Sequence, residues 1–185
     1  MNTFKALSKQ EFSMQPFSLV PIRMEDRYSI MEWRNEQMYH LRQNNLLSKE
    51  DQDQYFNTVV KKLFDQEKPD QNLFSYLNDG NVIGYGGLVH INWIDKHAEI
   101  SFIMNTALEE QFFESHWTNY LGLLEQVAFE ELNFHKIFVY AFDLRPRIYS
   151  VLKKNNYFKD ATLKDHCFYE TRFIDVVIYS KIQPV

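Results

Sequence analysis

The stretch "HAEISFIMNTALEEQFFESHWTNYLGLLEQVAFEELNFHKIFVYAF", residues 97–142, decides the fold. It begins with a short apolar run at 98–104 and ends with another at 136–142, and both have the length and composition of buried strands. Between them, residues 116–132 place apolar side chains at helical spacing on one face: Trp117, Tyr120, Leu121, Leu124, Val127, Ala128 and Leu132. A strand, a helix and a second strand in this order indicate a mixed α/β protein.

Upstream residues add helices and a hairpin. The sequence predicts a first strand at 17–22, a helix at 25–42, a second helix at 47–64, and two strands at 73–77 and 82–91. Ser48 and Asp51 have the spacing of a capping box, which supports the start of the second helix. The "NDGN" turn at 78–81 joins the two strands as a hairpin. Gly84, Gly86 and Gly87 in the second of these strands indicate a bulge or a close approach of another backbone.

The two ends of the chain complete this prediction. Pro146 fits the first turn of a helix that runs to about Asn155. The apolar runs around 167–170 and 173–180 predict two closing strands. Residues 1–16 lack a clear period, so we expect an N-terminal extension that packs on the rest of a single domain covering residues 1–185.

The composition excludes several classes of protein. A net charge of −5 gives little basis for neutralising nucleic-acid phosphates, and the longest apolar runs, such as "IFVYAF", are far shorter than a membrane span. The N-terminus has no apolar core of signal-peptide length, so we expect a cytoplasmic protein with no nucleic-acid or membrane partner. The six histidines lack the spacing of a zinc motif, and Cys167 has no second cysteine, so we predict no metal site.

Five short motifs resemble those of one enzyme family. They are "IMEWRNEQ" at 30–37, "NVIGYGGL" at 81–88, "AFEEL" at 128–132, "VLKKNNYF" at 151–158 and "FIDVVIYS" at 173–180. With the order of elements, they make residues 17–181 resemble the GNAT acyltransferases, the acetyl-CoA-dependent N-acetyltransferases. The nearest likeness is to the branch of ribosomal-protein and nucleotide-amino-sugar N-acetyltransferases. The resemblance implies a mixed, mostly antiparallel sheet of six to seven strands flanked by helices.

The resemblance also implies that acetyl-CoA binds along the strand at 98–104 and at the start of the following helix. Phe102, Ile103 and Met104 are the positions that would hold the pantetheine arm and polarise the thioester carbonyl. Arg145 takes the position of a family asparagine that meets the same arm. The diphosphate would lie on a loop before the helix, where backbone N–H groups and the helix dipole favour anions. That loop consists of Gln111, Phe112, Phe113, Glu114, Ser115 and His116.

This loop departs from the family pattern. It lacks the two glycines that let the backbone approach a phosphate. Its two phenylalanines narrow the space over the helix start, and Glu109, Glu110 and Glu114 would repel a diphosphate. We therefore keep two hypotheses: an N-acetyltransferase with a modified phosphate site, and a non-catalytic domain of the same fold that binds a small molecule or a protein partner. The wider match favours the enzyme, and the loop favours the binding domain.

Acetyl transfer by direct attack in a ternary complex needs a neutral amine and a proton for the departing thiolate. Glu99 is the first candidate for the base, because the resemblance places an acidic group on this strand; its alternative is a solvent-facing carboxylate. His90 is the second candidate, since histidine is the residue type that titrates nearest neutrality, and its alternative is a structural role. Leu152 replaces the family's proton-donating tyrosine, and Tyr149 lies one turn away as a candidate substitute.

The first helix borders the acceptor pocket in the family. Candidate acceptor-binding residues are Trp33, Arg34 and Asn35 on that helix, Arg42 two turns later, and Tyr85 on the glycine-containing strand. Arginine at this place suits a phosphate or carboxylate on the acceptor. Trp33 is better explained as core, and the arginines are explained equally well as solvated or paired with glutamates. An amino sugar, a small metabolite amine and a peptide N-terminus all fit as acceptors.

Overall fold

An eight-stranded sheet forms the centre of the computed structural model, which describes residues 2–41 and 43–183. Its strands are β1 (Phe12–Met14), β2 (Phe17–Pro21), β3 (Asn72–Asn78), β4 (Asn81–Asn92), β5 (His97–Met104), β6 (Lys136–Phe142), β7 (Phe158–Tyr169) and β8 (Arg172–Ile182). They lie in the order β1-β2-β3-β4-β5-β6-β8-β7, and β5–β6 is the one parallel pair among the described residues. The mixed, mostly antiparallel sheet confirms the predicted fold class, with one strand more than the six to seven expected.

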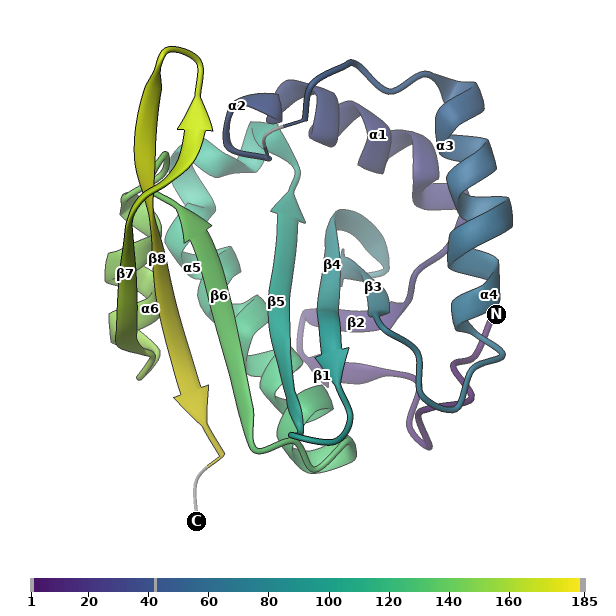
Figure 1. Cartoon of the computed structure of the whole chain (residues 1–185). Helices are drawn as coiled ribbons and strands as arrows, with labels where there is room; N and C mark the ends of the chain where they lie inside the picture. The colour runs from purple at the N-terminus through teal and green to yellow at the C-terminus, as the bar shows by residue number, and fades with distance from the viewer. Residues whose placement is uncertain (1, 42, 184–185) are drawn as a thin grey trace.

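Helices cover the sheet from both sides (Figure 1). Helices α5 (Thr106–Glu125) and α6 (Arg147–Lys154) lie behind the sheet in this view, and a π-helical segment, η3 (Gln126–Glu131), extends α5. The remaining helices lie along the top and right of Figure 1 and are η1 (Met24–Asp26), α1 (Arg27–Glu36), α2 (Met38–Leu41), α3 (Lys49–Tyr55), the π-helical η2 (Phe56–Val60) and α4 (Lys61–Leu63). In the described part of the chain, no helix is long and apolar enough to cross a membrane.

The amphipathic face of α5 joins the helix to the sheet. Tyr120, Leu121 and Leu124 are fully buried there, as are Val127 and Ala128 in η3. Burying a side chain of this size contributes about 1.5–3 kcal/mol, so this face supplies a large part of the core. The prediction of a strand, an amphipathic helix and a strand over residues 98–142 is therefore confirmed.

The start of α5 differs from the prediction. The helix begins at Thr106, ten residues before the expected start at His116, so the predicted loop at 106–115 is wrong. Asn105 caps the helix, since its side-chain oxygen accepts a hydrogen bond from the N–H of Ala107 at 3.0 Å. Residues 107–111, "ALEEQ", are strong helix formers. The backbone N–H groups of the expected phosphate loop consequently lie inside a helix.

The helix predicted at 25–42 is interrupted at Gln37, which separates α1 from the short α2. The Gln37 side chain is buried and donates hydrogen bonds to the carbonyl of Met104 at 2.8 Å and to Thr106 Oγ1 at 3.1 Å. The break therefore anchors the end of α1 to the junction of β5 and α5. Arg42 lies outside the described residues.

The second helix and the N-terminal segment follow the prediction more closely. Ser48 and Asp51 form the capping box at the start of α3, and the helical path continues to Leu63. Phe4, Leu7 and Phe12 are buried in the main core, so residues 1–16 pack on the sheet where they are described. Within this segment the prediction missed the short strand β1.

The last hairpin is longer than expected. β7 begins at Phe158, nine residues before the strand predicted at 167–170. It is an edge strand, and most of its residues up to 166 are polar and exposed or half-buried. The apolar alternation that identifies a half-buried strand is therefore missing from its sequence.

Candidate active site

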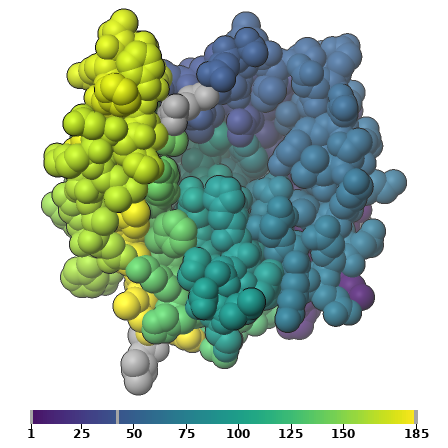
Figure 2. Space-filling view, in the orientation of Figure 1, coloured from purple at the N-terminus to yellow at the C-terminus, as the bar shows by residue number. Residues whose placement is uncertain are grey.

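The candidate site lies where the parallel strands separate. β5 and β6 pair at His97, Ala98 and Glu99, and within the described residues their pairing does not continue beyond Glu99. A cavity of about 300 Å³ opens between them, lined by residues of β4, β5, β6, α2, α5 and the start of α6. Figure 2 shows this face hollowed below α1 and α2, between the β7–β8 hairpin and the helices α3 and α4. We call this cavity the cleft.

Aromatic side chains of β5 and α5 close the inner wall of the cleft. The rings of Phe102 and Tyr120 stack with centroids 3.8 Å apart, and Trp117 meets Phe102 edge-on at 5.0 Å. The hydroxyl of Tyr120 donates a hydrogen bond to the carbonyl of Ser101 at 2.8 Å. A Cβ atom added to Gly86 would lie 2.0 Å from that same carbonyl oxygen. The expected close backbone approach at the glycine-containing strand is thus confirmed.

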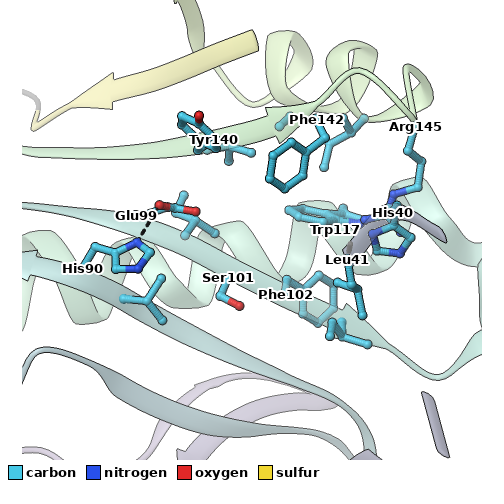
Figure 3. Close-up of a pocket in the computed structure, with 16 residues that line it drawn as sticks. His40, Leu41, His90, Glu99, Ser101, Phe102, Trp117, Tyr140, Phe142 and Arg145 are labelled. Carbon is cyan, nitrogen blue, oxygen red and sulfur yellow. Dashed lines mark hydrogen bonds and ion pairs between the residues drawn. The ribbon is translucent and has the colours of Figure 1, made fainter. Parts of the chain in front are cut away.

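His90 and Glu99 meet at one end of the cleft (Figure 3). His90 Nδ1 and Glu99 Oε2 are 2.8 Å apart, and both residues line the cavity. The pairing between β4 and β5 is irregular from Val89 to Asn92, and His90 adopts a left-handed backbone conformation with φ of 49°. Such a conformation is uncommon for a residue other than glycine and is often found at functional sites. The two base candidates from the sequence therefore form one pair.

Arginines gather at the opposite end of the cleft, where Figure 3 shows Arg145 beside His40. Arg145 Nη1 donates to Glu109 Oε1 at 2.7 Å, and Arg147 Nη2 donates to Glu109 Oε2 at 2.7 Å. Burial lowers the pKa of Arg145. Burial, and then the positive charges of Arg145 and Arg147, lower the pKa of His40 to about 3. This end of the cleft is therefore cationic although His40 itself is neutral.

The residues expected to hold the cofactor arm lie on β5 as predicted, but they differ in what they can contact. Phe102 and Ile103 line the cleft, whereas Met104 does not. Met104 is buried, and its carbonyl accepts the hydrogen bond from Gln37. The cofactor-binding role of these residues stays a prediction.

The residues expected to form the phosphate loop do not form a site. Gln111 and Phe112 are exposed, and Ser115 donates its hydroxyl to the carbonyl of Phe112 at 3.0 Å, within the helix. Glu114 forms an ion pair with Lys154 on α6. The prediction that this segment binds phosphate through backbone N–H groups is wrong for this structure, because those groups belong to the interior of α5.

Two further members of that segment are buried. Phe113 packs beneath Arg145 and Arg147. His116 lies in an aromatic cluster, with its Nδ1 3.3 Å from the hydroxyl of Tyr76, and burial lowers its pKa. A neutral, buried His116 does not offset the charge of nearby glutamates.

Tyr149 is also poorly placed for the proton-donating role considered from the sequence. It is not among the residues that line the cleft. Its hydroxyl donates to Asp143 Oδ1 at 2.9 Å, and its ring stacks on Tyr179. Burial and the hydrogen bond to Asp143 raise its pKa. The geometry therefore gives no support to Tyr149 as the acid.

The acceptor-side candidates separate into core and cavity residues. Trp33 is buried in the core, and Asn35 bonds to the backbone of Leu47 through its Nδ2 and Oδ1 atoms. Arg34 Nη1 donates to the hydroxyl of Tyr85 at 2.8 Å, and both residues line a second cavity of about 230 Å³ between α1, α3 and β4.

Several residues of the site were not identified from the sequence. Ser101 and Trp117 line the cleft, but their positions look like ordinary strand and helix core positions in the sequence. Glu109 and Arg147 were not assigned to the site either. Their signal was topological: the carboxyl ends of two parallel strands meet at one edge of a sheet, so residues just after β5 and just after β6 become neighbours. In the described part of the chain, no cluster of His, Cys, Asp or Glu could hold a metal ion.

Comparison with known proteins identifies the family. Residues 19–178 match the family model described as "Acetyltransferase (GNAT) domain". A spermidine N-acetyltransferase from Vibrio cholerae, solved in complex with CoA and spermine, has 20% sequence identity and a TM-score of 0.76, with coverage of 92% of this chain and 97% of that one. A second similar structure, a probable acetyltransferase, has 17% identity and a TM-score of 0.73, and the match covers 93% of this chain and 96% of the other. At these identities the two structures establish the fold alone, whereas the family model spans most of the chain. The chain therefore belongs to the GNAT acetyltransferase domain family and is an N-acetyltransferase that uses acetyl-CoA.

Proposed function

We propose that the protein acetylates a primary amine of a small molecule by direct attack in the cleft, with His90 and Glu99 preparing the amine. The observation that carries this proposal is the 2.8 Å contact between His90 Nδ1 and Glu99 Oε2 at one end of the cavity between β5 and β6. An amine is protonated near neutral pH, and only its neutral form is a nucleophile. A base beside the amine is therefore the first chemical requirement of the reaction.

The His90–Glu99 pair meets this requirement. With Nδ1–H donating to the Glu99 carboxylate, His90 Nε2 is left as a proton acceptor. Glu99 fixes the tautomer of the imidazole and stabilises the imidazolium that forms when Nε2 takes a proton from the ammonium, the same division of roles as in a histidine–carboxylate pair of a hydrolase. The His90 side chain is 78% exposed, whereas that of Glu99 is 21% exposed. A proton taken by His90 can therefore pass to solvent.

The edge of β5 fits the extended arm of acetyl-CoA. From Ile100 to Met104 the strand has no partner on the β6 side among the described residues, and five residues at roughly 3.3 Å each give this edge a length of about 16 Å. An extended amide-containing chain adds to such an edge by backbone hydrogen bonds. Bound acetyl-CoA supplies the activated acetyl group: the amine nitrogen forms a bond to the acetyl carbon, the carbon–sulfur bond breaks, and the surplus proton on nitrogen neutralises the thiolate.

The acceptor side supports a small molecule with an anionic group. The similar Vibrio cholerae structure contains spermine, a small amine. In the present chain, however, the second cavity carries Arg34, whose hydrogen-bond partner is the neutral hydroxyl of Tyr85, and no carboxylate pairs with Arg34 among the described residues. A half-buried guanidinium without an anion is an unfavourable state that a carboxylate or phosphate would relieve. Tyr85 pairs with Ile103, which lines the cleft, so the two cavities border neighbouring strand positions.

A turnover assay with matched amines tests this function. The purified protein is mixed with acetyl-CoA and, in turn, a linear diamine, an ω-amino acid of equal chain length, an amino sugar and a peptide with a free N-terminus. Thiol release and the mass of the product are measured. We expect an acetylated small amine, with the ω-amino acid preferred over the diamine, and no acetyl-enzyme in the absence of acceptor. Acetylation of the peptide alone, or accumulation of a stable acetyl-enzyme, would overturn the proposal.

A further inference from the structure

Glu109 is a buried carboxylate held by two arginines at the end of the cleft. It lies in the first turn of α5 and is 7% exposed. Its Oε1 accepts from Arg145 and its Oε2 from Arg147, each at 2.7 Å, and Arg147 Nη1 also approaches the Glu109 carbonyl at 3.3 Å. Two guanidinium groups that converge on one small anion have the geometry of an anion-binding site.

Aromatic rings fix the two guanidinium groups independently of Glu109. The Arg147 guanidinium lies over the ring of Phe113, with 4.0 Å between its central carbon and the ring centroid, and Arg145 lies 5.1 Å from the same ring. Arg145 also faces Trp117 at 5.9 Å. Since stacking on an aromatic face stabilises a guanidinium group in place, the pair keeps its arrangement when its carboxylate partner is exchanged.

The charges of this cluster do not cancel. Two guanidinium groups and one carboxylate leave a net charge of one positive unit, and the neighbouring His40 is neutral. The Arg147 side chain is 42% exposed, so the pair is open to solvent on one side, while Arg145 lines the cleft on the other. A ligand with more negative charge than a carboxylate would therefore bind the same two arginines more strongly.

The position of the pair matches the far end of the edge of β5. The arginines follow β6 and precede or begin α6, beside the start of α5, so they lie at the carboxyl ends of the two parallel strands. An arm that starts at the His90–Glu99 end and runs along β5 therefore ends beside Arg145 (Figure 3), which shares Glu109 with Arg147. Because α5 already begins at Thr106, the backbone N–H groups of residues 111–116 lie inside the helix, and the two arginine side chains offer donors beside its first turn instead.

We propose that Arg145 and Arg147 bind the diphosphate of acetyl-CoA in this protein, and that Glu109 is an internal carboxylate that occupies their site until the diphosphate displaces it. The inference rests on the proposed function, since it takes the direction of the arm from the His90–Glu99 end of the cleft. It replaces the helix-start phosphate site that the sequence predicted with a site made of side chains. Glu109 then competes with the ligand, so its charge sets the affinity for the diphosphate.

Calorimetric titration tests the site with two probes, CoA and inorganic pyrophosphate, at low ionic strength. In Glu109→Gln the competing charge is gone, and we expect both probes to bind roughly tenfold more tightly, the change that corresponds to about 1.4 kcal/mol. In Arg147→Gln we expect affinity for both probes to fall by a similar factor. Glu130→Gln is the matched control, because Glu130 is exposed and lies in η3, at the far end of the same helical segment from Glu109. It should keep the wild-type affinities.

The outcomes separate this site from the proposed function. Unchanged affinities for both probes in Glu109→Gln and Arg147→Gln, with acetyl transfer to small amines retained, overturn the arginine site and leave the function standing. Tighter pyrophosphate binding in Glu109→Gln and its loss in Arg147→Gln, without turnover of any amine, support the site and overturn the function. If Glu109→Gln does not fold, Arg147→Gln carries the test, since the Arg147 side chain is 42% exposed, and wild-type CoA affinity in that variant contradicts the proposal.

Discussion

His90 Nδ1 lies 2.8 Å from Glu99 Oε2 across the β4–β5 pair, at the point where β5 parts from β6. The irregular pairing after Val89 and the left-handed backbone of His90 bring the imidazole toward Glu99 on the neighbouring strand. Strand β5 therefore carries Glu99 at the start of its free edge and the cleft-lining residues Phe102 and Ile103 further along, while His90 reaches Glu99 from β4. The proposed base pair and the residues proposed to contact the cofactor arm thus line one cleft.

Replacing His90 by Gln should lower kcat/KM at neutral pH by roughly 10²- to 10⁴-fold, the usual contribution of a general base. The loss should shrink at alkaline pH, because the amine then loses its proton without help. Glu99→Gln should give a smaller loss with the same pH trend, since the imidazole remains but its tautomer is no longer fixed. Thiol release measured across a pH series checks both variants.

His135→Gln is the control for this pair, because His135 is exposed and does not line the cleft. It should keep the wild-type pH profile. A loss in His90→Gln that is equally large at every pH would contradict a base and indicate a structural or binding role instead.

Gly86 should tolerate no side chain. A Cβ atom at this position would lie 2.0 Å from the Ser101 carbonyl oxygen and 2.6 Å from the Tyr120 hydroxyl, and the backbone oxygen cannot move away cheaply. We expect Gly86→Ala to destabilise the fold by at least about 1–3 kcal/mol, the common range for overpacking. Gly122→Ala is the matched control, because its Cβ meets the Met14 sulfur at 3.3 Å on a helix that favours alanine by up to about 1 kcal/mol. Urea unfolding compares the two, and equal stability would contradict the close approach.

The central unit of the fold could be predicted because local and global signals agree there. The apolar runs of β5 and β6 and the periodic face of α5 each have a single good interpretation. The first nine residues of β7 could not be predicted, since an edge strand with two largely polar faces has no alternation to detect. The start of α5 was missed for a different reason: the family pattern suggested a loop, whereas Asn105 and the helix formers after it dictate a helix.

The site was predicted in part, and the missing part depends on contacts between distant residues. His90 and Glu99 were each named from residue type and strand position, but their pairing depends on an irregularity that no short motif reveals. Glu109 and Arg145 are 36 positions apart in sequence, and only the parallel arrangement of β5 and β6 brings them together. Residue type and strand position therefore identified individual residues of the site, but not which of them contact one another.

Arg34 should determine which amines are accepted. If its guanidinium binds an anionic group of the acceptor, Arg34→Gln should raise KM for an ω-amino acid about tenfold, which corresponds to about 1.4 kcal/mol of lost binding. KM for a diamine of equal length should stay the same or fall, because the substitution removes a positive charge that would repel the second ammonium group. Tyr85→Phe removes the hydroxyl that orients Arg34 at 2.8 Å and should give a smaller change in the same direction. Equal effects on both acceptors would contradict the assignment. Tyr28→Phe is the control for losing a tyrosine hydroxyl elsewhere, because the Tyr28 hydroxyl pairs with Asp53.

His40 should make the folded protein less stable in mild acid. Burial, followed by the charges of Arg145 and Arg147, lowers the pKa of His40 to about 3, whereas an unfolded histidine has a pKa near 6.5. Between about pH 6.5 and pH 3 the unfolded chain binds a proton at His40 that the folded chain does not. The free energy of unfolding therefore falls as pH falls through this window. The neutral His40 ring contacts the Tyr39 ring, with centroids 4.8 Å apart, and His40 Nε2 lies 3.1 Å from Gln37 Oε1. Neither partner adds a negative charge that would favour protonation of His40.

Urea unfolding of the wild type and of His40→Gln, measured from pH 8 to pH 5, tests this dependence above the range where most carboxylates titrate. We expect the free energy of unfolding of the wild type to drop more steeply toward pH 5 than that of His40→Gln, because the variant has no proton to gain at this position on unfolding. The two proteins should approach a constant difference above pH 7. Parallel curves over the whole range would show that His40 takes up its proton equally in both states, and would contradict its burial beside the two arginines.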